Sequence, residues 1–245
     1  MSTKIEKKLD TVEVNSQTNQ YVKLKKSQKI YLFLRNICDR IIAFLVILLL
    51  LPLWLILALT IRYSSKGSAI FKQKRVGRNR KQFDCYKWRS LRADAPKYMA
   101  HKDFDNINNY ETKVGAFIRK TSIDELAQLF NILKGDMSII GYRPLISQEI
   151  DEDILRASYG IYQIRPGMSG WAQVSDRETK SAEEKVKMDL YYLQHVGLWI
   201  DIKIFFKTIF ALVGGLFKRN KNKSKERKGT QEAIEPTLEK EEIKS

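Results

Sequence analysis

Two adjacent carboxylates, Asp124 and Glu125, are the residues of this 245-residue chain that best fit phosphate chemistry. They stand near the expected start of a helix, inside the segment RKTSIDELAQLFNILKGDMSIIGYRP at 119–144. An ionised aspartate can attack phosphorus and form an acyl-phosphate, and a neighbouring carboxylate can hold Mg²⁺, which prefers hard oxygens. A helix N-terminus favours anionic carboxylates and phosphate oxygens alike. We therefore predict that Asp124 is a catalytic nucleophile and that Glu125 is a catalytic residue and metal ligand.

The same pair also has a purely structural interpretation. Ser122 stands three residues before Glu125, which is the spacing of a capping box. Acidic residues in a first turn also interact favourably with the helix dipole. From the local sequence alone, helix capping and catalysis both remain open for Asp124 and Glu125.

Basic residues surround the pair in sequence and predict a clamp for a pyrophosphate, although each one taken alone is equally a solvated surface charge. Arginine can contact phosphate through two parallel hydrogen bonds, and Pro144 restricts Arg143 to an extended backbone. A second loop, RPGMSGW at 165–171, is either an ordinary turn or a loop whose backbone approaches a nucleotide. The candidate phosphate-binding residues are Lys87, Arg89, Arg119, Lys120, Arg143 and Arg165.

The remaining candidates for chemistry are weaker. Asp189, in KMDLYYLQH, is either a helix-surface acid or a further metal ligand. His101 and His195 lie far apart and have no histidine or cysteine neighbour at ligand spacing, so a zinc site or histidine triad has little support. Cys38 and Cys85 are expected to be free thiols in a reducing compartment. Lipidation of Cys38 is the alternative to an unmodified side chain.

An uncharged apolar run at 41–61 is interrupted by Pro52. As a helix it would reach ~32 Å, enough for a hydrocarbon core of ~30 Å. The long preceding segment and the lack of a small-residue cleavage site argue against a signal peptide. Basic residues flank both ends, and positive residues stay on the cytoplasmic side. Since a spanning helix would translocate one basic cluster, the charges favour a re-entrant helix with its bend at Pro52 over a spanning one.

The composition points to anionic partners, because the formal net charge is +16. Nucleic acid, phosphorylated small molecules and the cytoplasmic membrane surface all fit this charge. The apolar patterns predict strands at 69–76 and 82–90 around a turn, helices at 122–134 and 181–195, and an amphipathic segment at 199–217.

These elements predict a mainly helical α+β fold with four regions along the chain. Residues 1–27 form a flexible tail, and residues 28–66 form the re-entrant membrane helix. Residues 67–217 form a small cytosolic catalytic domain with interfacial helices. Residues 218–245 form a charged, disordered tail.

The motifs resemble those of a known family over about residues 27–215. After the proline-broken apolar segment come, in order, FKQKRVGRNRKQFDCYKWRSL, TKVGAFIRKTSIDELAQLFNILKGDMSIIGYRP, RPGMSGWAQV and MDLYYLQHVGLWIDIKIFFKT. This order resembles the bacterial sugar transferases, the monotopic polyprenyl-phosphate phosphoglycosyl transferases that start capsule and exopolysaccharide assembly.

The resemblance implies transfer of a phosphosugar from a UDP-sugar to undecaprenyl phosphate, with release of UMP and use of Mg²⁺. It implies a location among the lipids at the cytoplasmic face of the bacterial cell membrane, with Pro52 as the bend of a re-entrant helix. The family's functional positions match Lys87, Arg119, Asp124, Glu125, Arg143 and Asp189.

Three departures from the family pattern accompany the match. Tyr142 replaces the first proline of Pro-Arg-Pro, Ala127 replaces the proline of DELPQ, and SDRETK at 175–180 replaces an Asn-Gly-Arg type of sequence. The rival interpretations are a membrane-anchored nucleic-acid-binding or scaffold protein and a glycosyltransferase that releases UDP. We expect no nucleic-acid partner, because no recognition module is visible. The sugar, the polymer and a homodimer are left open.

Overall fold

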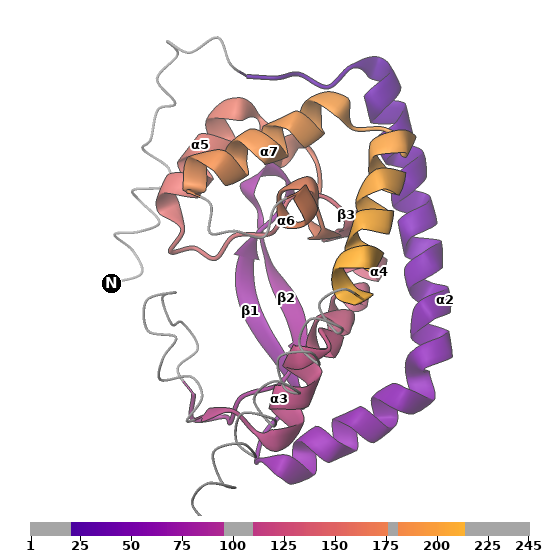
Figure 1. The fold of residues 1–245 in the computed structure, drawn as a ribbon, viewed down its shortest axis with the longest axis vertical. Helices are drawn as coiled ribbons and strands as arrows, with labels where there is room; N and C mark the ends of the chain where they lie inside the picture. The colour runs from indigo at the N-terminus through magenta and orange to yellow at the C-terminus, as the bar shows by residue number, and fades with distance from the viewer. Residues whose placement is uncertain (1–20, 96–109, 176–180, 214–245) are drawn as a thin grey trace, which may run out of the picture. The chain divides into compact units, whose positions relative to one another are not determined.

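The computed structural model describes residues 21–95, 110–175 and 181–213. The chain separates into a unit Met1–Ile204 and a second unit Phe205–Ser245. In the first unit, helices lie around two short strand pairs, which agrees with the expected mainly helical α+β class (Figure 1). The elements are α2 (Lys26–Ser64), β1 (Ile70–Val76), η1 (Arg78–Arg80), β2 (Gln82–Trp88), α3 (Lys113–Lys120), η3 (Ile123–Gln128), α4 (Leu129–Lys134), β3 (Ser138–Ile140), α5 (Ile150–Tyr159), η4 (Ile161–Gln163), β4 (Gly167–Ser169), α6 (Trp171–Ser175) and α7 (Ala182–His195). Residues 198–213 are also helical.

The helix α2 carries the apolar run and has 39 residues, with Pro52 inside it. In the described part of the chain it is the one helix long and apolar enough to cross a membrane. Only 11% of its most apolar window is buried, and side chains such as Leu48, Leu49 and Ile56 are exposed. This exposed apolar surface is typical of a membrane contact rather than of a core helix.

The helix is bent, as Figure 1 shows. Pro52 accounts for a bend, because proline removes an intrahelical hydrogen bond and clashes with the preceding turn. A straight helix of this length would separate its ends by ~57 Å. Both ends are nevertheless attached to the same unit: Gln28 donates to the Gln194 carbonyl at 3.0 Å, and Arg89 donates to the Ser65 carbonyl at 2.7 Å.

A buried polar network fastens the N-terminal half of α2. The Arg35 guanidinium contacts Asp201 at 2.9 Å, the Tyr192 hydroxyl at 2.6 Å and the Ser138 hydroxyl at 3.1 Å. The Ser138 hydroxyl in turn bonds the carboxylate of Asp39. Leaving a buried charge unpaired costs ~3–5 kcal/mol in measured cases. Any rotation or axial shift of α2 that broke these contacts would carry that cost, so the network fixes the position of α2 on the domain.

The strands β1 and β2 form the predicted antiparallel hairpin. Phe71 pairs with Lys87 and Gln73 pairs with Cys85. Side chains alternate along a strand and cross-strand partners share a face, so Cys85 and Lys87 face the same side. Cys85 is buried and Cys38 is exposed, and both are free thiols, as expected.

The predicted helix at 122–134 exists, but it begins as the 3-10 helix η3 before continuing as α4 to Gly135, whose φ is 89°. The capping-box interpretation of this start is wrong. Ser122 adopts a left-handed backbone with φ 58° and its side chain makes no capping hydrogen bond. Its carbonyl instead accepts the backbone N–H of Glu125 at 3.2 Å. Side-chain capping therefore does not explain why acids occupy positions 124 and 125.

The buried Asn131 ties α4 to β2. Its amide nitrogen donates to the Asp84 carbonyl at 2.7 Å, and its amide oxygen accepts the Tyr86 N–H at 2.9 Å. These two bonds set the position of β2, and hence of Lys87, relative to η3. The surrounding core includes Phe83, Trp88, Ile118, Leu129, Ile132 and Met137.

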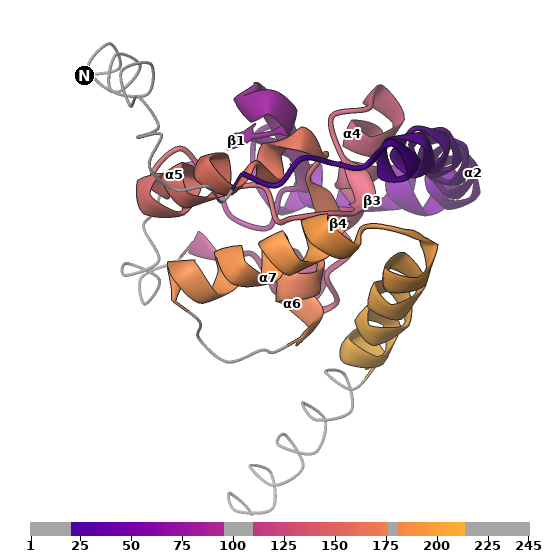
Figure 2. The ribbon, with the colours of Figure 1, turned by 90° about the horizontal axis from the view of Figure 1, so that it is seen from above.

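The loop RPGMSGW forms the short strand β4, which pairs in parallel with β3 through Ser138 and Gly167. A Cβ at Gly167 would lie 2.1 Å from the Gly141 nitrogen, so this close approach requires glycine. Helix α7 begins with a capping box of Ser181 and Glu184, as its polar start suggests. In Figure 2, α2 is seen almost end-on, with α4 and β3 next to it and α5 on the far side.

Candidate active site

The two carboxylates of η3 line different cavities, with Lys87 lining both. Asp124 lines a cavity of about 670 Å³ together with Trp88 and Arg119. Glu125 lines a cavity of about 20 Å³. Small-molecule sites occupy ~300–1,000 Å³, whereas a cavity of ~10–15 Å³ already holds one water. Space for a substrate therefore lies on the Asp124 side, and space for an ion or a water lies on the Glu125 side.

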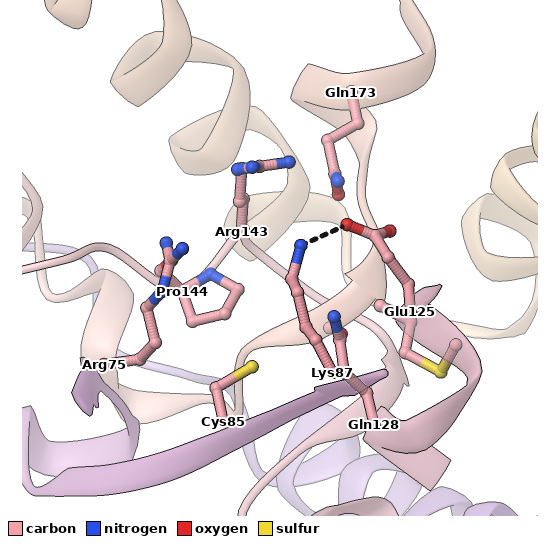
Figure 3. Close-up of a pocket in the computed structure, with 10 residues that line it drawn as sticks. Arg75, Cys85, Lys87, Glu125, Gln128, Arg143, Pro144 and Gln173 are labelled. Atoms are coloured by element: carbon pink, nitrogen blue, oxygen red, sulfur yellow. Dashed lines mark hydrogen bonds and ion pairs between the residues drawn. The ribbon is translucent and has the colours of Figure 1, made fainter. Parts of the chain in front are cut away.

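Glu125 is held inside a group of cations. Lys87 Nζ lies 2.8 Å from its Oε1 (Figure 3), and Arg75 and Arg143 line the same small cavity. Burial by itself would raise the pKa of Glu125, but the positive charges of Lys87, Arg143 and Arg75 outweigh it and hold this pKa below its usual value. Glu125 is therefore an anion at neutral pH.

Asp124 is in the opposite electrostatic situation. Asp124 is only 9% exposed, and this burial raises the pKa of its carboxyl group. Lys87 opposes that rise, Glu125 adds to it, and Arg119 opposes it. A carboxylate that is poorly solvated and less well compensated is a better nucleophile than one held in an ion pair. The two adjacent acids thus have different environments, as a nucleophile and a charge-holding partner require.

Arg75 is a candidate site residue that the sequence patterns did not single out. It lines the small cavity, and its guanidinium donates to the Pro144 carbonyl at 2.8 Å and to the Gln73 side chain at 2.6 Å. It therefore fixes the backbone next to Arg143. The strand alternation could have indicated this position. Gln73 pairs with Cys85, and Arg75, two residues further along the strand, lies on the same face.

Gln173 is a second missed residue. It lies in α6 and lines the small cavity, and Figure 3 shows its side chain directed towards Glu125. Its Oε1 is buried and has no hydrogen-bond partner within the described residues. A buried unpartnered acceptor indicates a place for a ligand, an ion or a water.

Arg119, predicted to bind phosphate, lines the same cavity as Asp124. Glu111 partly neutralises it at 3.2 Å. In the loop RPGMSGW, Gly167 and Met168 line the small cavity. The Arg165 side chain does not join them; it lines a separate cavity beside α2. The predicted grouping of Arg165 with the phosphate clamp is therefore not found.

Asp189 also differs from its predicted place. Its fully buried carboxylate lies 2.6 Å from Arg156, and Arg156 donates to the Arg143 carbonyl at 2.6 Å. In the described ranges no three acidic, histidine or cysteine side chains group as a metal site. Asp189 therefore pairs with the arginine that holds the Arg143 carbonyl, and it does not line the small cavity of Glu125.

The oxygens near the small cavity are of a type that could hold a magnesium ion if substrate phosphates supplied further ligands. Mg²⁺ prefers hard oxygens and commonly takes one or two protein carboxylates, with phosphates and waters completing its shell. Glu125 provides a carboxylate and Gln173 provides the unpartnered amide oxygen. Since Arg75, Lys87 and Arg143 outnumber Glu125 in charge, a cation would be favoured there only together with an anionic phosphate.

Comparison with known sequences identifies the class of protein. The bacterial sugar transferase family matches residues 30–215, so the chain belongs to this family. This confirms the resemblance inferred from the motifs.

Three relatives illustrate the match. The chain is 38% identical over 195 residues to the UDP-N-acetylgalactosamine-undecaprenyl-phosphate N-acetylgalactosaminephosphotransferase of Aeromonas hydrophila, covering 78% of this chain and 46% of that protein. It is 35% identical over 179 residues to the UDP-glucose:undecaprenyl-phosphate glucose-1-phosphate transferase of Escherichia coli, covering 70% of this chain and 38% of that protein. It is 34% identical over 188 residues to the exopolysaccharide production protein ExoY of Sinorhizobium fredii, covering 71% of this chain and 83% of that protein. The chain thus spans less than half of the first two relatives and most of the third.

Proposed function

We propose that this protein transfers a phosphosugar from a UDP-sugar to undecaprenyl phosphate and releases UMP, as the first membrane step of a capsular polysaccharide or exopolysaccharide. The observation that carries the proposal is the division of the acids: Asp124 lines a substrate-sized cavity, and Glu125 lies in an ion-sized one. The names of the relatives, which act on undecaprenyl phosphate, support the same reaction.

In the first step, the Asp124 carboxylate attacks the phosphorus that bears the sugar. The bond from this phosphorus to the bridging oxygen breaks, and UMP leaves with the electron pair. Lys87 and Arg119 line the same cavity as Asp124, so they can neutralise the pyrophosphate while it approaches the carboxylate. The product is a phosphosugar joined to Asp124 as an acyl-phosphate.

In the second step, a phosphate oxygen of undecaprenyl phosphate attacks the same phosphorus. The acyl-phosphate bond breaks and returns the carboxylate of Asp124, and the lipid leaves as a diphosphate sugar. Two hydrogen bonds hold the backbone at Arg143: Arg156 donates to the Arg143 carbonyl, and Arg75 donates to the Pro144 carbonyl. The Arg143 side chain can then stabilise negative charge on the phosphates. Mg²⁺, when bound near Glu125 and Gln173, would supply further positive charge to the phosphates.

We further propose that α2 enters and leaves the membrane on its cytoplasmic face. The support is the bend, the exposed apolar surface and the attachment of both helix ends to one unit. Single cysteines introduced near residues 20 and 75, in a variant that lacks the native thiols, would be labelled in intact cells with a membrane-impermeant reagent. Protection at both positions is expected, and labelling at one position only would mean that α2 spans the membrane.

The reaction is tested by incubating the detergent-solubilised protein with undecaprenyl phosphate, Mg²⁺ and a panel of UDP-sugars. Release of UMP from at least one sugar is expected, and release of UDP would indicate a glycosyltransferase that leaves the phosphate behind. Without lipid acceptor, mass spectrometry of the quenched protein should show a phosphosugar adduct on the peptide that contains Asp124. The covalent mechanism would be overturned if the active protein never showed the adduct and if the Asp124→Asn variant released UMP at the wild-type rate.

A further inference from the structure

A third cavity, of about 430 Å³, lies beside the N-terminal part of α2 and is called the basal cavity here. Its walls come from α2, from the η1 turn of the hairpin and from the segment after η4. None of its lining residues lines the cavities of Asp124 or Glu125. The residues that matter for its chemistry are Lys29, Phe33, Arg35, Arg78 and Arg165.

One face of α2 forms the wall of the basal cavity nearest the apolar run. Lys29, Leu32, Phe33 and Asn36 line it, and their spacing of i, i+3, i+4 and i+7 places them on a single helical face. Phe33 remains 66% exposed. The wall therefore presents a cation and an exposed apolar ring one turn apart, at the end of the helix that precedes the apolar run.

The charges of the basal cavity are not balanced. Arg35 is neutralised by Asp201, but the lining contains no acidic residue. Within the described ranges, Lys29, Arg78 and Arg165 make no ion pair, and the Arg78 side chain donates to the Gln163 carbonyl at 3.1 Å. Burial lowers the pKa of the Arg165 guanidinium, and the nearby charges of Arg40, Arg78 and Arg35 lower it further, while the buried carboxylate of Asp39 opposes this shift only in part.

This arrangement is repulsive until an anion enters. Like charges brought together in a partly desolvated cavity disfavour one another, and a phosphate group would relieve that repulsion through charge-assisted hydrogen bonds. A soluble phosphate would use only the cations. An anionic lipid would use the apolar wall as well, since exposed Ile30, Leu34 and Ile37 continue the surface of α2 beside Phe33.

We propose that the basal cavity binds the headgroup phosphate of an anionic phospholipid, with Lys29, Arg78 and Arg165 around the phosphate and Phe33 against the beginning of an acyl chain. This lipid site shares no lining residue with the cavities of Asp124 and Glu125, in which the proposed reaction is placed. Its physical effect would be to neutralise the base of α2 and hold the membrane helix against the hairpin.

The proposal is tested by native mass spectrometry of the full chain in detergent, after mixing with phosphatidylglycerol or phosphatidylcholine. The wild-type protein is expected to retain phosphatidylglycerol at least threefold more than phosphatidylcholine. The variant Lys29→Gln/Arg78→Gln should lose this preference. The matched control Lys113→Gln/Lys187→Gln also removes two exposed charges, on α3 and α7 and outside the cavity lining, and should keep the preference.

Two further arms separate the sources of phosphate and guard against misfolding. Inorganic phosphate at millimolar concentration should not displace the lipid; displacement would mean a site for soluble phosphate and would overturn the lipid assignment. Arg78→Lys keeps the charge at an exposed turn residue and should retain the preference. If the double variant unfolds, each single Gln variant should still lose part of the preference, and a preference equal to wild type in both would overturn the proposal.

The outcome does not depend on the transfer reaction. Lys29 and Arg78 line the basal cavity and neither of the cavities of Asp124 and Glu125, so the double variant should release UMP in detergent at the wild-type rate. Loss of lipid retention with intact UMP release supports a separate lipid site. Parallel loss of both in a folded protein would overturn that separation.

Discussion

The active site and the basal cavity use the same kind of side chain in two different ways. Around Glu125 three cations, Arg75, Lys87 and Arg143, share one carboxylate, and Lys87 is held in an ion pair of 2.8 Å. The basal cavity has cations and no lining carboxylate. Cations at a catalytic centre must be in place before the substrate arrives, and an internal anion achieves that. A site that only binds can leave its cations unbalanced, because the ligand itself supplies the missing charge.

The largest effect on the active-site side of this comparison is expected from Asp124→Asn. This change keeps the shape of the side chain and removes the nucleophile, so UMP release should fall by about 10³-fold or more. The unfolding temperature should change little, because losing one negative charge at a helix N-terminus costs only ~0.3–1 kcal/mol of stability. Asp84→Asn, on the hairpin, is the matched control because Asp84 is partly exposed and pairs with Lys74 at the surface. Activity close to wild type in Asp124→Asn would remove Asp124 from the chemistry.

A second prediction concerns the support of Arg143. Asp189→Asn leaves the buried Arg156 with Glu152 as its remaining carboxylate, so we expect a stability loss approaching ~3 kcal/mol, measured by chemical denaturation. The kcat/KM should fall as well, because Arg156 holds the Arg143 carbonyl. A metal-ligand role would instead raise the Mg²⁺ concentration needed for activity at unchanged stability. Asp151→Asn, on the exposed side of α5, is the control.

A third prediction sets the two regions directly against each other. Arg143→Lys keeps the positive charge but loses the planar guanidinium that can make two parallel hydrogen bonds. A hydrogen bond to a charged group contributes ~1.5–3 kcal/mol, so its loss should lower kcat/KM ~10- to 100-fold. Arg78→Lys makes the same change in the basal cavity and should leave UMP release unchanged. Equal effects of the two changes would show that Arg143 acts only as a diffuse positive charge.

The smallest expected effect is a displacement of the pH profile. Burial already raises the pKa of Asp124, and Lys87 opposes the rise. Lys87→Gln removes this opposing charge, so the pKa should rise further and Asp124 should be protonated over a wider acidic range. The acid limb of log kcat/KM against pH should therefore move to higher pH, in addition to any loss of rate. Lys74→Gln, at the surface of β1, should leave the limb in place; an unmoved limb in Lys87→Gln would mean that Asp124 is not the group that titrates.

Much of the fold could be read from local patterns. Alternating residues predicted the hairpin, Gly135 predicted the helix end, and the proline-broken apolar run predicted one long membrane-type helix. Local spacing failed at Ser122, where a left-handed backbone turns the side chain away from the capping geometry that its spacing with Glu125 suggested. A one-residue difference in backbone conformation is not visible in a pattern of residue types.

The sequence by itself determined the family, the membrane-type helix and the basic character of the protein, and it pointed to Asp124 and Glu125 as the candidate reactive pair. Only the tertiary structure decided that Asp124 and Glu125 line different cavities, that Arg75 and Gln173 line the cavity of Glu125, and that Arg165 lines a separate one. The physical reason is that helix and strand periods specify which side of an element a residue occupies. Which distant element faces that side depends on long-range packing, here on the bonds from Asn131 to β2 and on the parallel pairing of β3 with β4.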